Sequence, residues 1–191
     1  MQVGTAFAYC AESGLSDEYK QAVLKTIVDG QARVLTDPVA SPTGFPFKVV
    51  QLEGSLSEHE VAAARARICD LGYLRESYRT PDGAIGYRCA AEPLTVYVSK
   101  GGNPENTVGR KCVCNALMAN IGFPQVRNQY LELGLITSGD DLAGITRFLP
   151  SAGTYYTAAD VLSALLSPQE MSKSVDQPFG LPVDSATATA D

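Results

Sequence analysis

The sequence predicts an α/β fold, and its opening supplies the main support. Residues 2–10 alternate large apolar and small side chains, as a strand does. A helical pattern then runs from Ser16 to Gly30, and residues 33–36 form a second strand-like run. Strand, helix and strand in this order is the unit of a parallel sheet. The 191 residues, 45% of them hydrophobic, suffice for one compact domain, alone or with a small module.

The expected helix after Ser16 has both a start signal and a buried face. Asp17 and Glu18 stand in its first turn, where the helix dipole favours negative charge. Apolar residues then recur three and four positions apart, which predicts that one side of this helix is buried. Gly30 is placed to end it.

Residues 36–48 contain three prolines, a glycine and two phenylalanines. The prolines and the glycine prevent regular structure, whereas a flexible linker has no need of aromatic side chains. We therefore expect a rigid, packed loop, which either lines a site or covers one end of a sheet.

The remainder of the chain predicts a mixed helical and β region followed by a tail. Turn residues at 81–83 and a β-rich run at 94–98 indicate β-structure within residues 69–100. Helices are expected at residues 57–68, at residues 115–121, after Ser138 and after Thr157. Residues 167–191 are mostly small or polar, which predicts a disordered tail.

Charge and cysteine content narrow the class of protein. A net charge of -6 without a basic stripe argues against nucleic acid as a partner. No apolar run approaches the roughly 18 residues that suggest a membrane span, and no Lys or Arg precedes the first apolar run as in a secretory signal. An odd number of cysteines, five, fits a reducing cytosol, so we expect a cytoplasmic protein. The single histidine, His59, lies between Glu58 and Glu60, which predicts a surface residue.

Four of the cysteines, Cys69, Cys89, Cys112 and Cys114, fall within one stretch, and Cys10 stands apart. Four thiolates could close a tetrahedral zinc site. Only Cys112 and Cys114 form a close pair, however, and the doubled C-x-x-C spacing that strongly indicates zinc is absent from the sequence. Buried free thiols are the alternative, and the sequence leaves both open.

Gly4 and Thr5 lie side by side in the first expected strand. A glycine inside a strand often marks a place where a ligand or another backbone approaches closely. If a phosphate approaches, neighbouring amides and the threonine hydroxyl can donate hydrogen bonds to it. The alternative is an ordinary buried strand with a packing glycine. The glycine-rich patterns of dinucleotide folds and P-loops do not occur in this sequence.

Several runs of the sequence resemble the FMN-dependent nitronate monooxygenases, once called 2-nitropropane dioxygenases. Residues 2–7, together with Cys10 and residues 12–14, resemble the last barrel strand of that family. Residues 36–48 resemble the segment that follows the eighth helix in a long-chain branch of it. Three later runs resemble the same branch: residues 67–75, 109–117 and 137–141. The resemblance extends to about Leu166.

This resemblance implies a (β/α)8 TIM barrel that binds FMN at the C-terminal ends of its strands, where a phosphate commonly lies near the last loops. It places Gly4 and Thr5 at the FMN phosphate, with Gln2 and Val3 contributing from the strand. The implied activity is that of an oxidoreductase: dioxygen oxidises an alkyl nitronate to a carbonyl compound and nitrite, and the flavin carries the redox chemistry. The family's catalytic histidine lies upstream of the matched region, so no catalytic residue is expected in this chain.

A complete barrel takes about 250 residues, and the resemblance begins at the eighth strand. We therefore expect a C-terminal fragment: residues 1–52 as the last strand and helix with a covering loop, and residues 53–166 as an α+β extension containing the cysteines. The isolated chain should bind FMN weakly and lack turnover, with an upstream barrel fragment as its complementing partner. Two alternatives remain, a non-catalytic interaction module stabilised by zinc and a flavin-dependent enoyl reductase.

Overall fold

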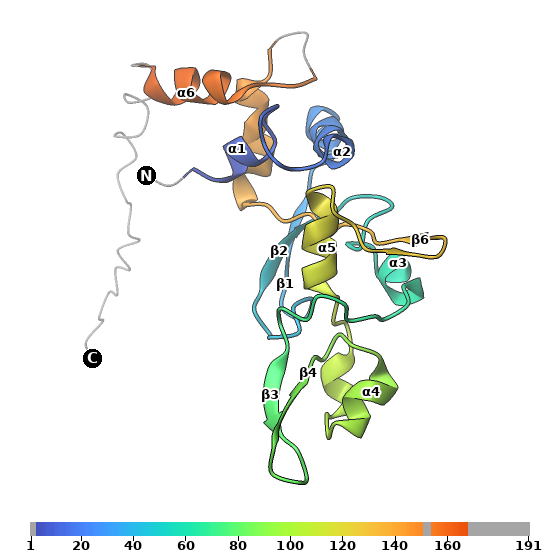
Figure 1. The fold of residues 1–191 in the computed structure, drawn as a ribbon. Coiled ribbons are helices and arrows are strands. Elements are labelled where there is room, and N and C mark those ends of the chain that lie inside the picture. Colours follow the sequence, from blue (N-terminus) through green and yellow to red (C-terminus); the bar gives the residue numbers. More distant parts are fainter. Residues whose placement is uncertain (1–2, 151–153, 168–191) are drawn as a thin grey trace, which may run out of the picture.

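The computed structural model describes residues 3–150 and 154–167. These residues form a mixed α/β fold with three two-stranded antiparallel sheets and no closed barrel (Figure 1). The helices are α1 (Thr5–Ala8), α2 (Asp17–Val28), α3 (His59–Ala64), α4 (Leu94–Ser99), α5 (Val113–Asn120) and α6 (Ala158–Leu166), with 3-10 helices η1 (Pro104–Thr107) and η2 (Asp140–Phe148). The strands are β1 (Val34–Asp37), β2 (Phe47–Val50), β3 (Glu76–Arg79), β4 (Ile85–Arg88), β5 (Val126–Arg127) and β6 (Tyr130–Leu131).

The strand expected at residues 2–10 is wrong in its described part, because Thr5–Ala8 forms the single helical turn α1. Two of these four residues are alanines, which favour helix. No strand of the described chain pairs with this segment, so a β conformation would leave its backbone groups without partners. The buried hydroxyl of Tyr156 instead donates to the carbonyl of Ala6 at 2.6 Å.

Helix α2 forms where it was expected, and Gly30 adopts the positive φ of 67° that follows a helix end. Strand β1 also agrees with the sequence pattern. The expected parallel arrangement is wrong, because β1 pairs antiparallel with β2. The loop between them, residues 38–46, is shorter than the crossover of a dozen or more residues that a parallel pair requires, so the chain folds back as a hairpin.

The packed loop that the sequence predicted between β1 and β2 is confirmed only in its middle, because Phe45, one of the two aromatic residues behind the prediction, is 64% exposed. Ala40 and Ser41 are fully buried. The carboxylate of Asp37 accepts hydrogen bonds from the amides of Val39 and Ala40, each at 2.9 Å. The amide of Lys111 donates to the carbonyl of Ala40 at 2.8 Å, which ties the loop to a distant part of the chain.

The hairpin β3–β4 confirms the turn predicted at residues 81–83. The β-rich run at 94–98 is wrong, because it forms helix α4. Pro93 precedes the first residue of this helix, and its carbonyl accepts from the amide of Tyr97 at 2.9 Å. The Tyr97 ring is buried, with the guanidinium of Arg88 over it at 5.5 Å. Burial of this ring decides the conformation, since β propensity depends strongly on neighbours.

The four helices predicted by apolar spacing also form, with some ends shifted. Helix α3 is shorter than the expected 57–68, because Arg65 leaves the helical conformation. Helix α5 covers most of the expected 115–121. Helices η2 and α6 begin close to Ser138 and Thr157, and Thr157 forms a capping box with Asp160. The tail predicted at residues 167–191 lies almost wholly outside the described residues.

Buried apolar side chains form two clusters that meet at β2. Val50 belongs to the first, the terminal cluster, built from α1, α2, η2 and α6 at one end of the molecule (Figure 1). Val49 belongs to the second, the central cluster, which consists of Val49, Leu56, Val113, Ala116 and Leu135. Successive residues of a strand point to opposite faces, so one short strand serves both clusters. Within the described ranges, no helix has the length and apolar character needed to cross a membrane.

Candidate functional site

The predicted phosphate-binding residues lie at the start of α1. Gly4 is exposed, and no atom lies within 4 Å of the position that a Cβ would take there. Thr5 is half-buried, and its hydroxyl oxygen accepts a hydrogen bond from the amide of Gly139 at 3.0 Å. Val3 packs against the terminal cluster, and Gln2 lies outside the described residues. The backbone at Gly4 is therefore open to approach.

This segment fits the phosphate end of FMN locally. The Thr5 hydroxyl acts as acceptor toward Gly139, so its own proton remains available for a phosphate oxygen. A flavin ring also needs a surface of the protein to pack against, and the described residues place no barrel strand beside the segment 3–10. Gly4 and Thr5 thus offer phosphate contacts without an enclosing flavin pocket.

Three cysteines of the predicted zinc site lie near one another, since Cys69 contacts Cys89 and Cys112 interacts electrostatically with both, but the four differ in burial. Cys89 and Cys112 are buried, whereas Cys69 and Cys114 are half-buried. Across the described ranges, no group of three or more His, Cys, Asp or Glu side chains is placed to hold a metal ion. The zinc site at Cys69, Cys89, Cys112 and Cys114 therefore lacks geometric support and stays a prediction.

Cys69 has the chemical environment of a reactive thiol. A hydrogen bond from the Cys89 thiol, assisted by the guanidinium of Arg75, lowers the pKa of Cys69 to about 6. The same sulfur contact, together with burial, raises the pKa of Cys89. Low pKa and partial exposure are the properties that distinguish reactive cysteines from inert buried ones. The sequence did not signal this pairing, because the two cysteines are far apart along the chain.

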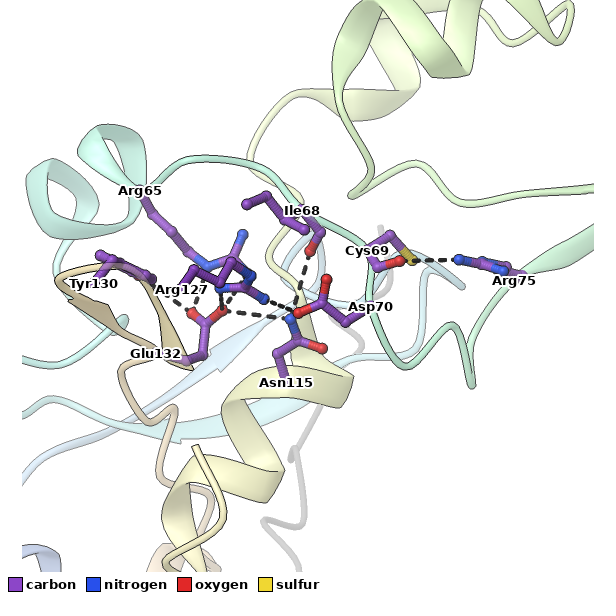
Figure 2. Close-up of polar contacts among 9 residues, drawn as sticks. All are labelled: Arg65, Ile68, Cys69, Asp70, Arg75, Asn115, Arg127, Tyr130 and Glu132. Carbon is purple, nitrogen blue, oxygen red and sulfur yellow. Dashed lines mark hydrogen bonds and ion pairs between the residues drawn. The ribbon is translucent and has the colours of Figure 1, made fainter. Parts of the chain in front are cut away.

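The most extensive polar cluster around the central region centres on Glu132, which is fully buried (Figure 2). Arg65 donates to both carboxylate oxygens, with Nε at 2.5 Å from Oε1. Arg127 donates to Oε2 at 3.2 Å and also pairs with Asp70. The side-chain amide of Asn115 adds a contact to Oε2 at 3.4 Å. One buried carboxylate thus holds segments from α3, α5 and the β5–β6 hairpin together.

Burial alone would raise the pKa of Glu132, but Arg65, Arg127 and Asn115 together outweigh burial, so the pKa is lowered. Glu132 is therefore ionised at neutral pH and carries no proton to transfer. With both arginines and Asn115 as partners, it acts as a structural anchor. Sequence reasoning missed this cluster because Arg65 and Glu132 are 67 positions apart and each resembles an ordinary surface charge.

His59 is exposed at the first residue of α3, as expected of a surface residue.

Comparison with protein-family models, with curated proteins and with solved structures gives no match to this chain.

Proposed function

We propose that this chain forms the C-terminal part of an FMN-dependent nitronate monooxygenase, in which Gly4 and Thr5 bind the phosphate of FMN. The substrates are an alkyl nitronate and dioxygen, and the products are a carbonyl compound and nitrite. The observation that carries this proposal is that the runs resembling the family, though far apart in sequence, contact one another.

One contact joins the first run, residues 2–7, to the last run, residues 137–141. A second joins the loop run, residues 36–48, to the same last run. The amide of Gly139 donates to the Thr5 hydroxyl oxygen at 3.0 Å. Lys48 forms an ion pair with Asp140. Residues 137–141 therefore lie against both the expected phosphate segment and the end of the loop run.

Further contacts join the loop run to residues 109–117, and residues 109–117 to residues 67–75. The amide of Lys111 donates to the carbonyl of Ala40, and the Arg110 guanidinium donates to the carbonyl of Val39 at 2.9 Å. The Asn115 side-chain amide reaches the carbonyl of Ile68 at 3.5 Å. Runs that resemble one family and touch one another favour a shared structural purpose over chance similarity.

In this proposal each residue of the segment has a defined role. Gly4 leaves the backbone bare, so a phosphate oxygen can approach it closely. The Gly139 amide orients the Thr5 hydroxyl, whose proton then points to the phosphate. The terminal cluster holds α1 in place through Ala6 and Tyr9. When bound, FMN supplies the redox chemistry of nitronate oxidation.

Reconstitution tests this function. The chain is mixed with a polypeptide comprising the first seven strand–helix units of a nitronate monooxygenase, and FMN fluorescence and nitronate-dependent oxygen uptake are recorded. We expect weak flavin binding by either part alone, and quenched FMN fluorescence with oxygen uptake by the mixture. Flavin binding by the mixture without oxygen uptake on any alkyl nitronate would exclude the activity and leave the enoyl reductase alternative for a nicotinamide assay.

Variants locate the flavin contact. Replacing Gly4→Val blocks the open approach and should weaken FMN binding by the mixture roughly tenfold or more, because a charge-assisted hydrogen bond is lost. Gly14→Val is the matched control, since Gly14 is also exposed with no atom within 4 Å of a Cβ. Thr5→Ser should retain binding and Thr5→Val should reduce it. Equal binding by both glycine variants would place the phosphate elsewhere.

A further inference from the structure

A cavity of about 660 Å³ lies beside the start of α3, between β1 and the segment 107–111. Three cationic side chains, Arg67, Arg110 and Lys111, line both this cavity and a smaller one next to it. The cavity is separate from the segment at Gly4, since none of its lining residues belongs to α1 or to the segment around Gly139 that contacts Thr5.

Lys111 is a largely buried cation with only distant partners. Its side chain is 12% exposed, and its Nζ lies 3.8 Å from the Asp37 carboxylate and 3.5 Å from the carbonyl of Ser57. Burial lowers the pKa of Lys111 by more than Asp37 raises it. A charge removed from water in this way is costly unless it is closely paired. The Lys111 ammonium group therefore has no ion-pair or hydrogen-bond partner at short distance among the described residues.

Arg67 has an unused donor in the same place. Its Nη2 donates to the carbonyl of Thr107 at 2.9 Å, which fixes the guanidinium. Its Nη1 is buried and has no hydrogen-bond partner among the residues that the structure describes. Native proteins rarely leave such a donor unpaired, so an oxygen atom from a ligand is a natural partner.

Two acidic side chains, Asp37 and Glu58, also face the cavity, and each accepts backbone hydrogen bonds through one of its oxygens. Asp37 accepts from the amides of Val39 and Ala40 and thereby shapes the loop. Glu58 accepts from the amide of Gly54 at 2.9 Å. Arg110 is held by the carbonyls of Val39 and Ser41, at 2.9 and 2.5 Å, and keeps its positive charge at the cavity edge. With three cationic and two carboxylate side chains, the lining of the cavity carries a net positive charge.

Apolar side chains complete the lining. Leu35, Val39 and Val108 are 56%, 44% and 72% exposed and border the same cavity. Its volume falls within the range of about 300–1,000 Å³ typical of sites for small organic molecules. A ligand that fits combines an anionic group with an apolar body.

We propose that this cavity binds a small organic phosphate. Arg67 and Lys111 contact the phosphate from two different elements, and Leu35, Val39 and Val108 contact the organic part. A carboxylate has one charge and two oxygens, which a single guanidinium fork satisfies. A phosphate monoester carries more charge and three acceptor oxygens, which suits an ammonium and a guanidinium that approach from separate sides.

The test uses phenyl phosphate, inorganic phosphate and benzoate as probes on the full chain, with the amide NMR signals of Gly109 and Lys111 as reporters. We expect saturable shifts with phenyl phosphate, weaker binding of inorganic phosphate, and benzoate at least about tenfold weaker. Benzoate binding as tight as phenyl phosphate would overturn the phosphate assignment. No saturable shift with any probe at millimolar concentration would overturn the site.

Lys111→Met provides the matching variant, because methionine fills the space of the lysine side chain without its charge. We expect it to remain folded and to weaken phenyl phosphate binding about tenfold or more. Lys25→Met is the control, since Lys25 is 79% exposed on α2, away from this cavity. An unchanged affinity in Lys111→Met, with the fold intact by its amide spectrum, would contradict the proposal.

Discussion

The terminal and central regions of this molecule are held together by different physical effects. Fourteen buried apolar residues form the terminal cluster, whereas the central cluster contains five. The central region compensates with the ion-pair cluster around Glu132, where two arginines neutralise one buried carboxylate. Apolar burial responds to side-chain volume, and buried ion pairs respond to charge and pH. The two regions should therefore fail under different perturbations.

The largest effect is expected from Glu132→Ala. It leaves the 6%-exposed Arg65 side chain without its partner, and removing one member of a buried pair costs about 3–5 kcal/mol in the free energy of unfolding. Urea denaturation measures this loss. Glu76→Ala is the control, because its pair with Arg88 is half-exposed and should contribute less than about 1 kcal/mol. A comparable loss in both variants would mean that the Glu132 cluster contributes no more to the free energy of unfolding than an exposed ion pair does.

A second large effect is expected from Ile145→Ala in the terminal cluster. Ile145 is 1% exposed, and truncation of such a side chain costs about 2–5 kcal/mol, here about 3. Leu166→Ala serves as control, since Leu166 is 79% exposed and should change stability little.

Hydrogen exchange in these same variants sharpens the comparison between regions. Ile145→Ala should weaken protection in α2 more than in α5, and Glu132→Ala should do the reverse. Equal loss of protection in both helices would show that the regions unfold together as one unit.

Acid should weaken the central region before the terminal one. The pKa of Glu132 is lowered below 4.5 in the folded state, so its contribution is complete above pH 4.5 and is lost as the pH falls through the folded pKa. Glu12 and Asp160 of the terminal region also have lowered pKa values, but both are fully exposed and should contribute little. Amide exchange at decreasing pH, corrected for intrinsic rates, measures this order. Earlier loss of protection in α2 would contradict it.

A smaller, local effect concerns the Cys69 thiol. With a pKa of about 6, it should be alkylated by iodoacetamide at neutral pH faster than Cys89 or Cys112, which mass spectrometry can follow. Arg75→Gln should shift the rate profile of Cys69 to higher pH, because one stabilising cation is removed. Arg79→Gln, an exposed change on the adjoining strand β3, should leave it unchanged. Equal rates at the three cysteines would exclude the lowered pKa.

Local patterns predicted those elements whose determinants lie within a few residues. Helix α2 has its acidic first turn and its terminal glycine, α6 has the Thr157 cap, and the β3–β4 hairpin has its Pro-Asp-Gly turn. The aromatic residues of the loop between β1 and β2 did not indicate which part is buried, because Ala40 and Ser41 are buried and Phe45 is 64% exposed.

Elements that depend on distant partners could not be predicted in this way. Residues 2–10 and 94–98 are short runs compatible with helix or strand. Tyr156, about 150 positions away, contacts the first run, and burial of the Tyr97 ring beside Arg88 fixes the second. The antiparallel pairing of β1 was missed for a different reason: β1 pairs with the strand that follows it across a short loop and not with residues 2–10. Of the candidate site, the sequence named Gly4 and Thr5 but could not foresee that Gly139 holds the threonine hydroxyl.

Labelling the chain with nitrogen-15 shows whether its start binds the FMN phosphate, as we propose. Its amide spectrum is recorded in the reconstituted mixture with and without FMN. We expect the amide signals of Gly4 and Thr5 to shift on FMN addition and those of α4 to remain unchanged. Flavin bound at full occupancy with the Gly4 and Thr5 amides unmoved would contradict it.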